Sequence, residues 1–243
     1  MATVTDHYES VLADHYSWLF GGQNNNFQKN KEFFNSFDIK PFTNDKAIDL
    51  GCGSGFQSIP LAEIGFKVTS IDTSSRLLAE LSDIKNVLPI TVINDDLNNF
   101  DSYCTENVGL IVCMGDTLTH LESKDDVRTL MKKVYDNLEN NGYFIITYRD
   151  LSFELDELDR FIPVNNDDSR IFTCFLEYES EKVKVHDIIY EKDNRSWILK
   201  KSFYRKLRIP SDWLIRQLKE KKFLIKHESS DRGLFTIIAT KSS

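Results

Sequence analysis

A short apolar strand that runs directly into a glycine-rich turn constrains this chain more than any other stretch. Residues 46–55 read Lys-Ala-Ile-Asp-Leu-Gly-Cys-Gly-Ser-Gly, with glycines at positions 51, 53 and 55. Glycine adopts positive φ angles without strain and lets a ligand approach the bare backbone. The following residues predict a helix over 56–65, whose amino-terminal end would face the same ligand. This strand, turn and helix predict a site for a nucleoside-containing ligand at the edge of an α/β sheet.

Strand-like and helical segments alternate through the first 150 residues. Expected strands lie at 46–50, 67–72, 90–94, 108–114 and 142–149, with expected helices at 56–65, 75–84 and 124–140. A further helix at 211–222 and closing strands near 223–229 and 234–240 follow at the end of the chain. The pattern predicts an α/β fold, a doubly wound Rossmann-like sheet of seven strands that is mostly parallel and ends in an antiparallel strand.

The remaining segments divide the chain into four expected parts. Three β-rich runs between residues 171 and 208 are separated by turn signals at 180–182 and 193–194, which predicts an antiparallel β-meander. Because it would lie beside the carboxyl edge of the sheet, it is placed to cover a substrate. The expected division is a helical and aromatic segment at 1–40, a ligand-binding core at 41–150, the β insertion at 151–208, and a closing helix and strands at 209–243.

Composition excludes several kinds of partner. The formal net charge of −8 would oppose binding to the phosphate backbone of a nucleic acid. No apolar run approaches the roughly 18 to 20 residues that span a bilayer, and the polar first residues do not resemble a signal peptide. The four cysteines form no C-x-x-C pair and no cluster with histidine, so we expect neither a metal site nor disulfides. We therefore expect a cytoplasmic protein with a small-molecule partner.

Two residues of the turn discriminate between nucleoside cofactors. The dinucleotide fingerprint requires a glycine where this chain has Phe56, which disfavours a nicotinamide cofactor. Asp49, two residues before the first glycine, would repel a pyrophosphate and attract the ammonium group of a nucleoside that carries an amino acid. An NAD-dependent oxidoreductase is therefore only a remote alternative.

The stretch from Asp49 to Gly55 resembles motif I of the class I S-adenosylmethionine-dependent methyltransferases. The resemblance implies that S-adenosylmethionine is the cofactor. Asp72, at the end of the second strand and about 20 residues past the turn, would accept hydrogen bonds from both ribose hydroxyls. The resemblance places the cofactor against Asp49, Gly51, Cys52, Gly53, Gly55, Asp72 and Thr73.

Two further stretches extend the resemblance. In the family a carboxylate just beyond the third strand accepts from the adenine amino group; Asp96 is preferred here because Phe100 stands four residues later, and Asp95 is the second candidate. Leu97 follows in the same loop. Residues 109–121 resemble the fourth-strand segment of glycine N-methyltransferase, which places Met114 and Gly115 beside the methyl donor.

Four residues near the ends of the fourth and fifth strands are candidates for the methyl acceptor and its chemistry. These candidates are Asp116, His120, Tyr148 and Arg149. Arg149 resembles an arginine that grips the substrate carboxylate in glycine N-methyltransferase, or it could pair with Asp150 or Glu154.

Asp116 stands where that enzyme has an asparagine. This favours an acceptor with an amine or hydroxyl near Asp116. The alternative is that Asp116 is a structural loop acid that accepts from the backbone amides of Leu118 or Thr119. His120 has a structural reading beside the catalytic one.

Two other segments have two readings each. Residues 8–20 contain Tyr8, His15, Tyr16, Trp18, Leu19 and Phe20, which could fold over the cofactor as a lid or pack a helix onto the sheet. The basic run 200–208 would alternate its faces on a strand, with a solvated outer face, although Tyr204, Arg205 or Arg208 could reach the site.

The sequence thus predicts methyl transfer from S-adenosylmethionine to nitrogen or oxygen of a small polar acceptor. No Asn/Asp-Pro-Pro-Tyr/Phe stretch follows the fourth strand, which disfavours nucleic-acid bases as acceptors. The alternative from another class is a non-catalytic module that binds S-adenosylmethionine or S-adenosylhomocysteine and works through a protein partner. A homo-oligomer is compatible with the sequence, which does not identify the acceptor.

Overall fold

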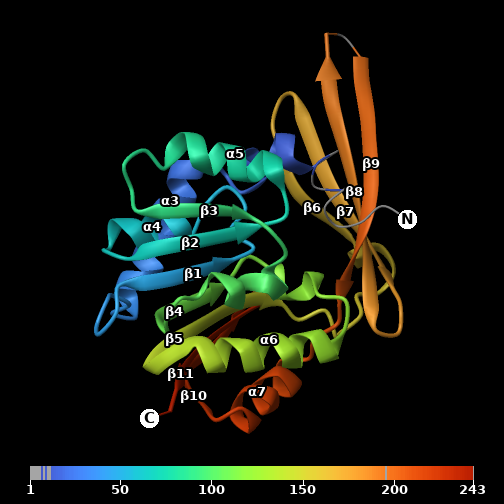
Figure 1. Cartoon of the computed structure of the whole chain (residues 1–243). Coiled ribbons are helices and arrows are strands. Elements are labelled where there is room, and N and C mark those ends of the chain that lie inside the picture. The colour runs from blue at the N-terminus through green and yellow to red at the C-terminus, as the bar shows by residue number, and fades with distance from the viewer. Residues whose placement is uncertain (1–6, 8, 10–11, 195, 243) are drawn as a thin grey trace.

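A computed structural model describes residues 7, 9, 12–194 and 196–242 and contains two separate β-sheets (Figure 1). The larger sheet has seven strands in the order β10-β11-β5-β4-β1-β2-β3. β11 runs antiparallel to both its neighbours, whereas β5, β4, β1, β2 and β3 pair in parallel. The predicted α/β fold is therefore confirmed. The strands are β1 (Lys46–Leu50), β2 (Lys67–Asp72), β3 (Ile90–Asn94), β4 (Val108–Cys113), β5 (Leu138–Arg149), β10 (Phe223–Asp231) and β11 (Leu234–Lys241).

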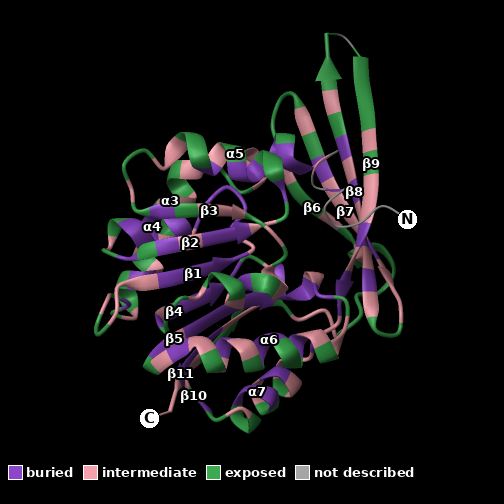
Figure 2. Ribbon diagram, in the orientation of Figure 1, coloured by how far each residue is buried: buried purple, intermediate pink, exposed green. Residues whose placement is uncertain are grey.

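Helices cover both faces of this sheet (Figure 1). One face packs on α3 (Gln23–Ser36), α4 (Ser58–Glu63) and α5 (Ser75–Ile84), and the other on α6 (Lys124–Asn137) and α7 (Ser211–Glu220). Successive side chains of a strand point to opposite faces. In β4, Leu110 and Val112 accordingly join the core under α3 to α5, while Ile111 and Cys113 join the core under α6 and α7. Figure 2 shows the central strands β1 and β4 mostly buried between these helices.

The second sheet is an antiparallel meander of four strands in the order β6-β7-β8-β9. Its strands are β6 (Phe161–Asn166), β7 (Arg170–Tyr178), β8 (Lys182–Asp193) and β9 (Ser196–Leu207). Three β-rich runs were predicted here, and β6 was missed. Proline is confined to edge strands because it lacks a backbone N–H, and Pro163 lies in β6 at the edge of this sheet. The proline and the preceding short 3-10 helix η5 (Glu157–Arg160) hide the strand from pattern reading.

Two element boundaries differ from the sequence prediction. The helix expected at 56–65 begins at Ser58, because residues 51–57 are used in the glycine turn. The helix expected to continue to 140 ends at Asn137, and β5 begins at once with Leu138 in an extended conformation. Leu138 pairs with Val108 before an irregularity over 139–142, so the polar stretch that resembled a helix stop lies inside the strand.

The described segment at residues 12–20 lies between the two sheets (Figure 1). We call residues 12–20 the strap; it contains the 3-10 helix η2 (Ala13–His15) and the short α2 (Tyr16–Leu19). On the meander side, Arg170 stacks 4.3 Å from the Trp18 ring, and the Asn165 side-chain amide donates to the Trp18 carbonyl. On the core side, Arg76 pairs with Asp14. Tyr8, part of the predicted aromatic lid, lies outside the described residues.

Among the helices in the described part of the chain, none combines the length and the apolar character needed to cross a bilayer.

Candidate functional site

A pocket lies at the carboxyl ends of β1, β2 and β4, where ligands bind in open α/β sheets. Seven of the predicted cofactor residues line it, together with one predicted acceptor-side residue, His120. The pocket is lined by Tyr16, Gly51, Gly53, Ile71, Asp72, Thr73, Ser74, Leu77, Asp95, Leu97, Gly115, Thr117 and His120. A broader groove along β10 lies at the edge of the sheet and brings none of these residues together.

The glycine turn brings bare backbone to the pocket wall. Gly51 has φ +71°, and a Cβ there would lie 2.3 Å from Cγ2 of Thr117. Only glycine allows this close approach between the turn after β1 and the loop after β4. Tyr16 of the strap closes the pocket from the other side, since a Cβ on Gly53 would lie 3.4 Å from the Tyr16 hydroxyl oxygen. About 90 Å³ of free space remains, less than the roughly 300 Å³ of a small ligand pocket.

Asp72 is held rigidly in the pocket wall. The Gly53 N–H donates to its Oδ2 and the Ser74 N–H donates to its Oδ1, both at 2.8 Å. Each carboxylate oxygen retains accepting capacity beyond these bonds. Burial raises the pKa of Asp72, and the two backbone donors oppose that rise. The arrangement fixes a carboxylate that can accept from a diol.

The two candidate adenine acids lie in different environments. Asp95 lines the pocket, and its carboxylate accepts from the Tyr103 hydroxyl at 2.7 Å and from the Asn99 amide at 2.9 Å. Asp96 instead caps the 3-10 helix η3 (Leu97–Tyr103) by accepting from the Asn98 N–H. Asp96 does not line the pocket. The geometry therefore favours Asp95, the second choice from the sequence, over Asp96.

Asp49 lies behind the turn rather than in the pocket wall. Its side chain is buried, and the Ser58 hydroxyl donates to Oδ2 at 2.6 Å. Ser70 in turn donates to the Ser58 hydroxyl at 2.8 Å. Burial raises the pKa of Asp49 to about 7, and the Ser58 hydrogen bond opposes that rise. A cation at the turn would draw this carboxyl into its ionised form.

Three other predicted cofactor residues support the site without lining it. Cys52 and Met114 are buried in the core under α3 to α5. Gly55 lets the turn pack on α5, because a Cβ there would lie 2.4 Å from Leu81. The sequence reading missed Ser74 and Thr117, which line the pocket. Ser74 directly follows the predicted pair Asp72 and Thr73 and also caps α5, so a helix-cap signal could have found it.

The acceptor-side acid Asp116 pairs with a lysine from the meander. The Lys206 ammonium donates to its Oδ2 at 2.7 Å, and the Arg149 backbone N–H donates to its Oδ1 at 2.6 Å. Arg149 Nε lies 3.8 Å from the same carboxylate. Burial opposes ionisation of Asp116, but Lys206 and Arg149 hold its pKa below the usual range. Neither partner expected for the Asp116 side chain, the amides of Leu118 and Thr119, is used.

His120 lies between the cofactor pocket and the meander. It ends the 3-10 helix η4 (Thr117–His120), lines the pocket and contacts the Tyr204 ring with 5.5 Å between ring centroids. Burial lowers the pKa of His120 to about 3, and the nearby Lys206 ammonium reinforces this effect. The imidazole is therefore neutral near pH 7, where it is a weak base that can accept a hydrogen bond.

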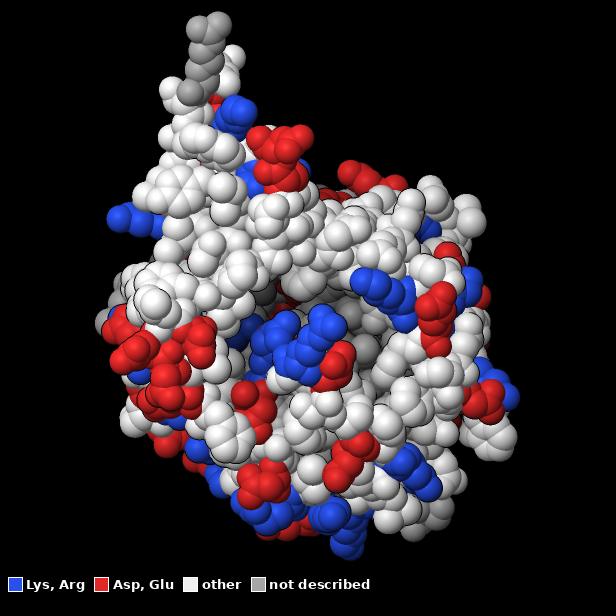
Figure 3. All heavy atoms as spheres, turned by 180° about the vertical axis from the view of Figure 1, so that it is seen from behind, with Lys and Arg blue, Asp and Glu red and all other residues white. Residues whose placement is uncertain are grey.

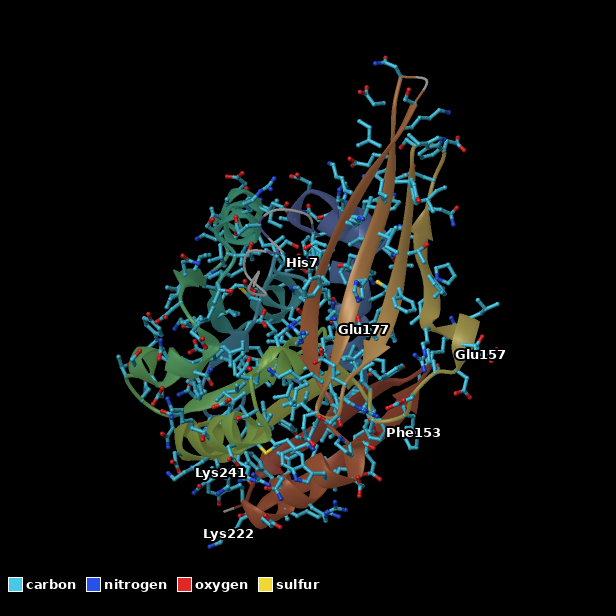
Figure 4. All side chains as sticks on the ribbon, turned by 90° about the vertical axis from the view of Figure 1, so that its right-hand side faces the viewer. His7, Phe153, Glu157, Glu177, Lys222 and Lys241 are labelled. Atoms are coloured by element: carbon cyan, nitrogen blue, oxygen red, sulfur yellow. The ribbon has the colours of Figure 1, made fainter. Side chains whose placement is uncertain are left out.

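Behind Tyr204, the His7 ring lies 4.5 Å away and pairs with Asp187 at 2.7 Å (Figure 4).

One acceptor-side candidate, Tyr148, lies away from the pocket, and one residue near the pocket, Lys206, was not among the candidates. Tyr148 lies within the hydrophobic core under α6 and α7, because it alternates in β5 with Thr147, which accepts from the Gly115 N–H. Tyr148 thus points away from the pocket. Lys206 was missed, although its neighbour Tyr204 was a candidate; the two share one face of β9, and residue spacing of two could have identified Lys206. Arg149 is 55 % exposed and lies outside the pocket wall.

Comparison with known proteins agrees with this geometry. Residues 47–142 match the methyltransferase domain family. A glycine/sarcosine N-methyltransferase from Aphanothece halophytica is 29% identical over 114 residues, which span 46% of this chain and 43% of that relative. The chain therefore spans less than half the length of that relative.

Solved structures share the whole architecture. An S-adenosylmethionine-dependent methyltransferase from Clostridium acetobutylicum ATCC 824 superimposes with a TM-score of 0.72 at 16% identity, covering 98% of this chain and 96% of the other. An amino pentose methyltransferase from Micromonospora echinaspora, solved with S-adenosylmethionine bound, gives a TM-score of 0.74 at 10% identity over 95% and 97% of the two chains. The fold is shared with these structures, and residues 47–142 match the methyltransferase domain family.

Proposed function

We propose that this chain, whose residues 47–142 match the methyltransferase domain family, transfers the methyl group of S-adenosylmethionine to nitrogen or oxygen of a small polar acceptor. The observation that carries the proposal is the pocket wall. It combines bare glycine backbone at Gly51, a rigid carboxylate at Asp72 and a second carboxylate at Asp95. These groups fit a nucleoside with a diol at one end and an exocyclic amine at the other. Asp49 lies behind the turn, where an ammonium group would be attracted.

The chain's own residues would mainly bind and orient. S-adenosylmethionine, when bound, supplies an electrophilic methyl group on a sulfonium centre. Asp72 and Asp95 would hold the nucleoside, and Gly51 and Gly115 leave room at the carboxyl ends of β1 and β4. The strap closes the pocket and excludes water, with Tyr16 over the turn. Most of the rate enhancement would come from alignment.

The acceptor would enter where the meander faces the pocket. His120 lines the pocket and contacts Tyr204 of the meander, and its neutral imidazole can accept a hydrogen bond from the attacking amine or hydroxyl and so orient it. The buried pair of Lys206 and Asp116 holds the loop that carries His120. In Figure 3 the molecule is hollowed near its centre, and Lys and Arg side chains lie beside the hollow. An anionic group on the acceptor would be attracted to such a rim.

The first test is calorimetric titration with S-adenosylmethionine, S-adenosylhomocysteine and NAD. Binding of the first two without NAD supports the proposal, and binding of NAD alone contradicts it. Asp72→Asn should weaken S-adenosylmethionine binding by at least about tenfold, which corresponds to roughly 1.4 kcal/mol. Asp83→Asn, on the outer part of α5 away from the pocket, is the control and should leave affinity unchanged.

Turnover is tested by the release of S-adenosylhomocysteine with panels of amino sugars, amino acids and phenols. For any acceptor that is methylated, mass spectrometry of the product identifies the atom that received the methyl group. His120→Ala should then lower kcat with little change in cofactor affinity. If the His120→Ala variant retained full kcat, the proposed role of His120 in the reaction would be contradicted.

A further inference from the structure

The meander has an inner and an outer face, and the described residues cover only the inner one. Along β8 the inward residues Val183, Val185 and Ile189 are buried in the cluster shared with the strap. The alternating residues at 184, 186, 188 and 190 point the other way. No helix or strand of the described residues lies over that outer face, which forms the right-hand side of Figure 1 and faces the viewer in Figure 4.

The outer face is far more apolar than a solvent-facing sheet should be. Antiparallel sheets with one wet side usually alternate apolar and polar residues. Here the outward positions include Phe161 at 50%, Trp197 at 47% and Leu199 at 45% exposure. Contiguous apolar patches of this kind on a soluble protein mark an interaction surface. The outward apolar and aromatic residues are Phe161, Ile171, Phe175, Ile188, Tyr190, Trp197, Leu199 and Phe203.

One row of aromatic rings crosses all four strands of this face. The register pairs Phe161 with Phe175, Phe175 with His186, and His186 with Phe203. Their ring centroids are 4.7, 5.6 and 5.6 Å apart in that order. The row reads Phe-Phe-His-Phe from β6 to β9, so it remains an aromatic row when its order is reversed.

The next row carries charge and is also self-complementary. Glu177 on β7 lies beside Lys184 on β8, which lies beside Arg205 on β9. The Lys184 ammonium donates to Glu177 at 2.8 Å, and the His186 ring nitrogen lies 2.9 Å from the same carboxylate. The acid on β7 and the cation on β8 exchange places when the sheet is turned about an axis that runs between these strands.

We propose that the outer face of the meander binds a second copy of this chain, forming a two-fold symmetric dimer by sheet-on-sheet packing. A two-fold axis along the strands, between β7 and β8, stacks β7 of one copy on β8 of the other. Phe175 then faces His186 of the second copy, Phe161 faces Phe203, and Glu177 faces Lys184. Such an isologous contact requires a self-complementary patch, which the two rows supply.

The size of the face suits a stable dimer. Four strands about 4.8 Å apart and roughly ten residues long at about 3.4 Å each give about 650 Å² of sheet face per copy. Two copies would bury about 1,300 Å², within the roughly 1,200–2,000 Å² of specific interfaces. The aromatic residues fit the enrichment seen at the centres of such contacts.

The test is the molar mass in solution, measured by light scattering after gel filtration at several protein concentrations. We expect twice the chain mass of 28.2 kDa. Leu199→Glu should convert the dimer to monomer, or raise its dissociation constant at least about a hundredfold, because two carboxylates would be buried in the contact. The matched control is Leu224→Glu, the same change at a β10 residue of similar exposure, 52%, which should leave the dimer intact.

Three results would overturn the dimer. The first is a wild-type chain that is monomeric at all concentrations. This holds also if the outer face of that monomer binds phosphatidylcholine vesicles. The second is a dimer that neither Leu199→Glu nor Phe175→Lys dissociates. The third is an equal loss of dimer in Leu199→Glu and Leu224→Glu. Circular dichroism of each variant establishes that it remains folded, so a monomer reports on the interface alone.

Discussion

Single buried charges set the pH behaviour of this molecule, and Asp49 is the clearest case. Its folded pKa is about 7, raised by burial, against about 3.9 in an unfolded chain. Between these pH values the folded state binds more protons, so the free energy of unfolding falls as the pH rises from about 4 to about 7. Asp49→Asn cannot ionise and should escape this loss. Its stability relative to wild type should therefore grow by about 2.5 kcal/mol between pH 5 and pH 7.5.

Urea denaturation of the cofactor-free protein at the two pH values measures this difference. Asp45→Asn is the control with the opposite sign, because a hydrogen bond from Lys67 lowers the pKa of that exposed carboxyl. Its relative stability should not grow with pH. An Asp49→Asn variant whose relative stability stays constant between pH 5 and 7.5 would show that the carboxyl is already ionised.

Lys206 and Asp116 form an ion pair. Removing both partners should cost less unfolding free energy than the sum of removing each alone. Their side chains are only 11% and 13% exposed. Lys206→Met leaves the Asp116 carboxylate buried without its ammonium partner and should cost about 3 kcal/mol of unfolding free energy. The double variant with Asp116→Asn should cost clearly less than the sum of the two single changes.

A double-mutant cycle by chemical denaturation tests the coupling. Lys200→Met is the control on the same strand, since its pair with Glu191 is partly exposed and should contribute no more than about 1 kcal/mol. Strict additivity of the Lys206 and Asp116 changes would contradict the coupling.

At the scale of elements, the turn between β1 and α4 depends on one close approach. Gly51→Ala forces a Cβ to within 2.3 Å of Thr117 and should weaken S-adenosylmethionine binding by at least about tenfold by displacing the loop after β4. Gly233→Ala is the matched control, because Gly233 has a similar φ of +79° with no atom within 4 Å. It should lose about 1 kcal/mol of stability and retain its affinity.

Calorimetric titration and thermal unfolding of both variants separate these effects. Equal losses of affinity would mean that positive φ alone, rather than the contact with Thr117, controls the pocket.

Elements with a strong local signal were predictable from the sequence, and those that depend on distant partners were not. The turn at 51–55 and the alternating segments led to the seven-stranded sheet, because a parallel sheet buried on both faces has characteristic apolar strands. β6 escaped prediction because Pro163 weakens its pattern. The start of β5 at Leu138 escaped because its pairing with Val108, thirty residues away, decides the conformation.

The same distinction holds in the site. Gly51, Asp72 and Thr73 follow recognisable strands, and all three line the pocket. The contact of Lys206 with Asp116, by contrast, forms only because β9 packs against the loop after β4. Tyr148 lies in the core and not at the pocket, because the sequence places it near the end of β5 without stating which face it occupies. Side-chain direction at strand ends is set by the register with neighbouring strands.

At the scale of the whole molecule, Glu9 and the strap at residues 12–20 together join the core to the meander across the pocket. Glu9 accepts from the Ser74 hydroxyl at 2.8 Å at the amino-terminal end of α5, while Trp18 contacts Arg170 and Asn165 of the meander. With only about 90 Å³ of free space beneath Tyr16, the strap must move to admit a cofactor and should close again over it. Cofactor binding should therefore order both sheets together.

Hydrogen exchange with and without S-adenosylhomocysteine tests this coupling. We expect slower exchange in the strap, in the first turn of α5 and in β8, and no change in the hairpin of β10 and β11, which lies away from the pocket. Glu9→Gln weakens the contact with α5 and should speed cofactor dissociation severalfold, whereas Glu32→Gln, on the exposed side of α3, should not. Protection confined to the glycine turn and β2 would show that the cofactor is held by the core alone and that the strap does not close over it.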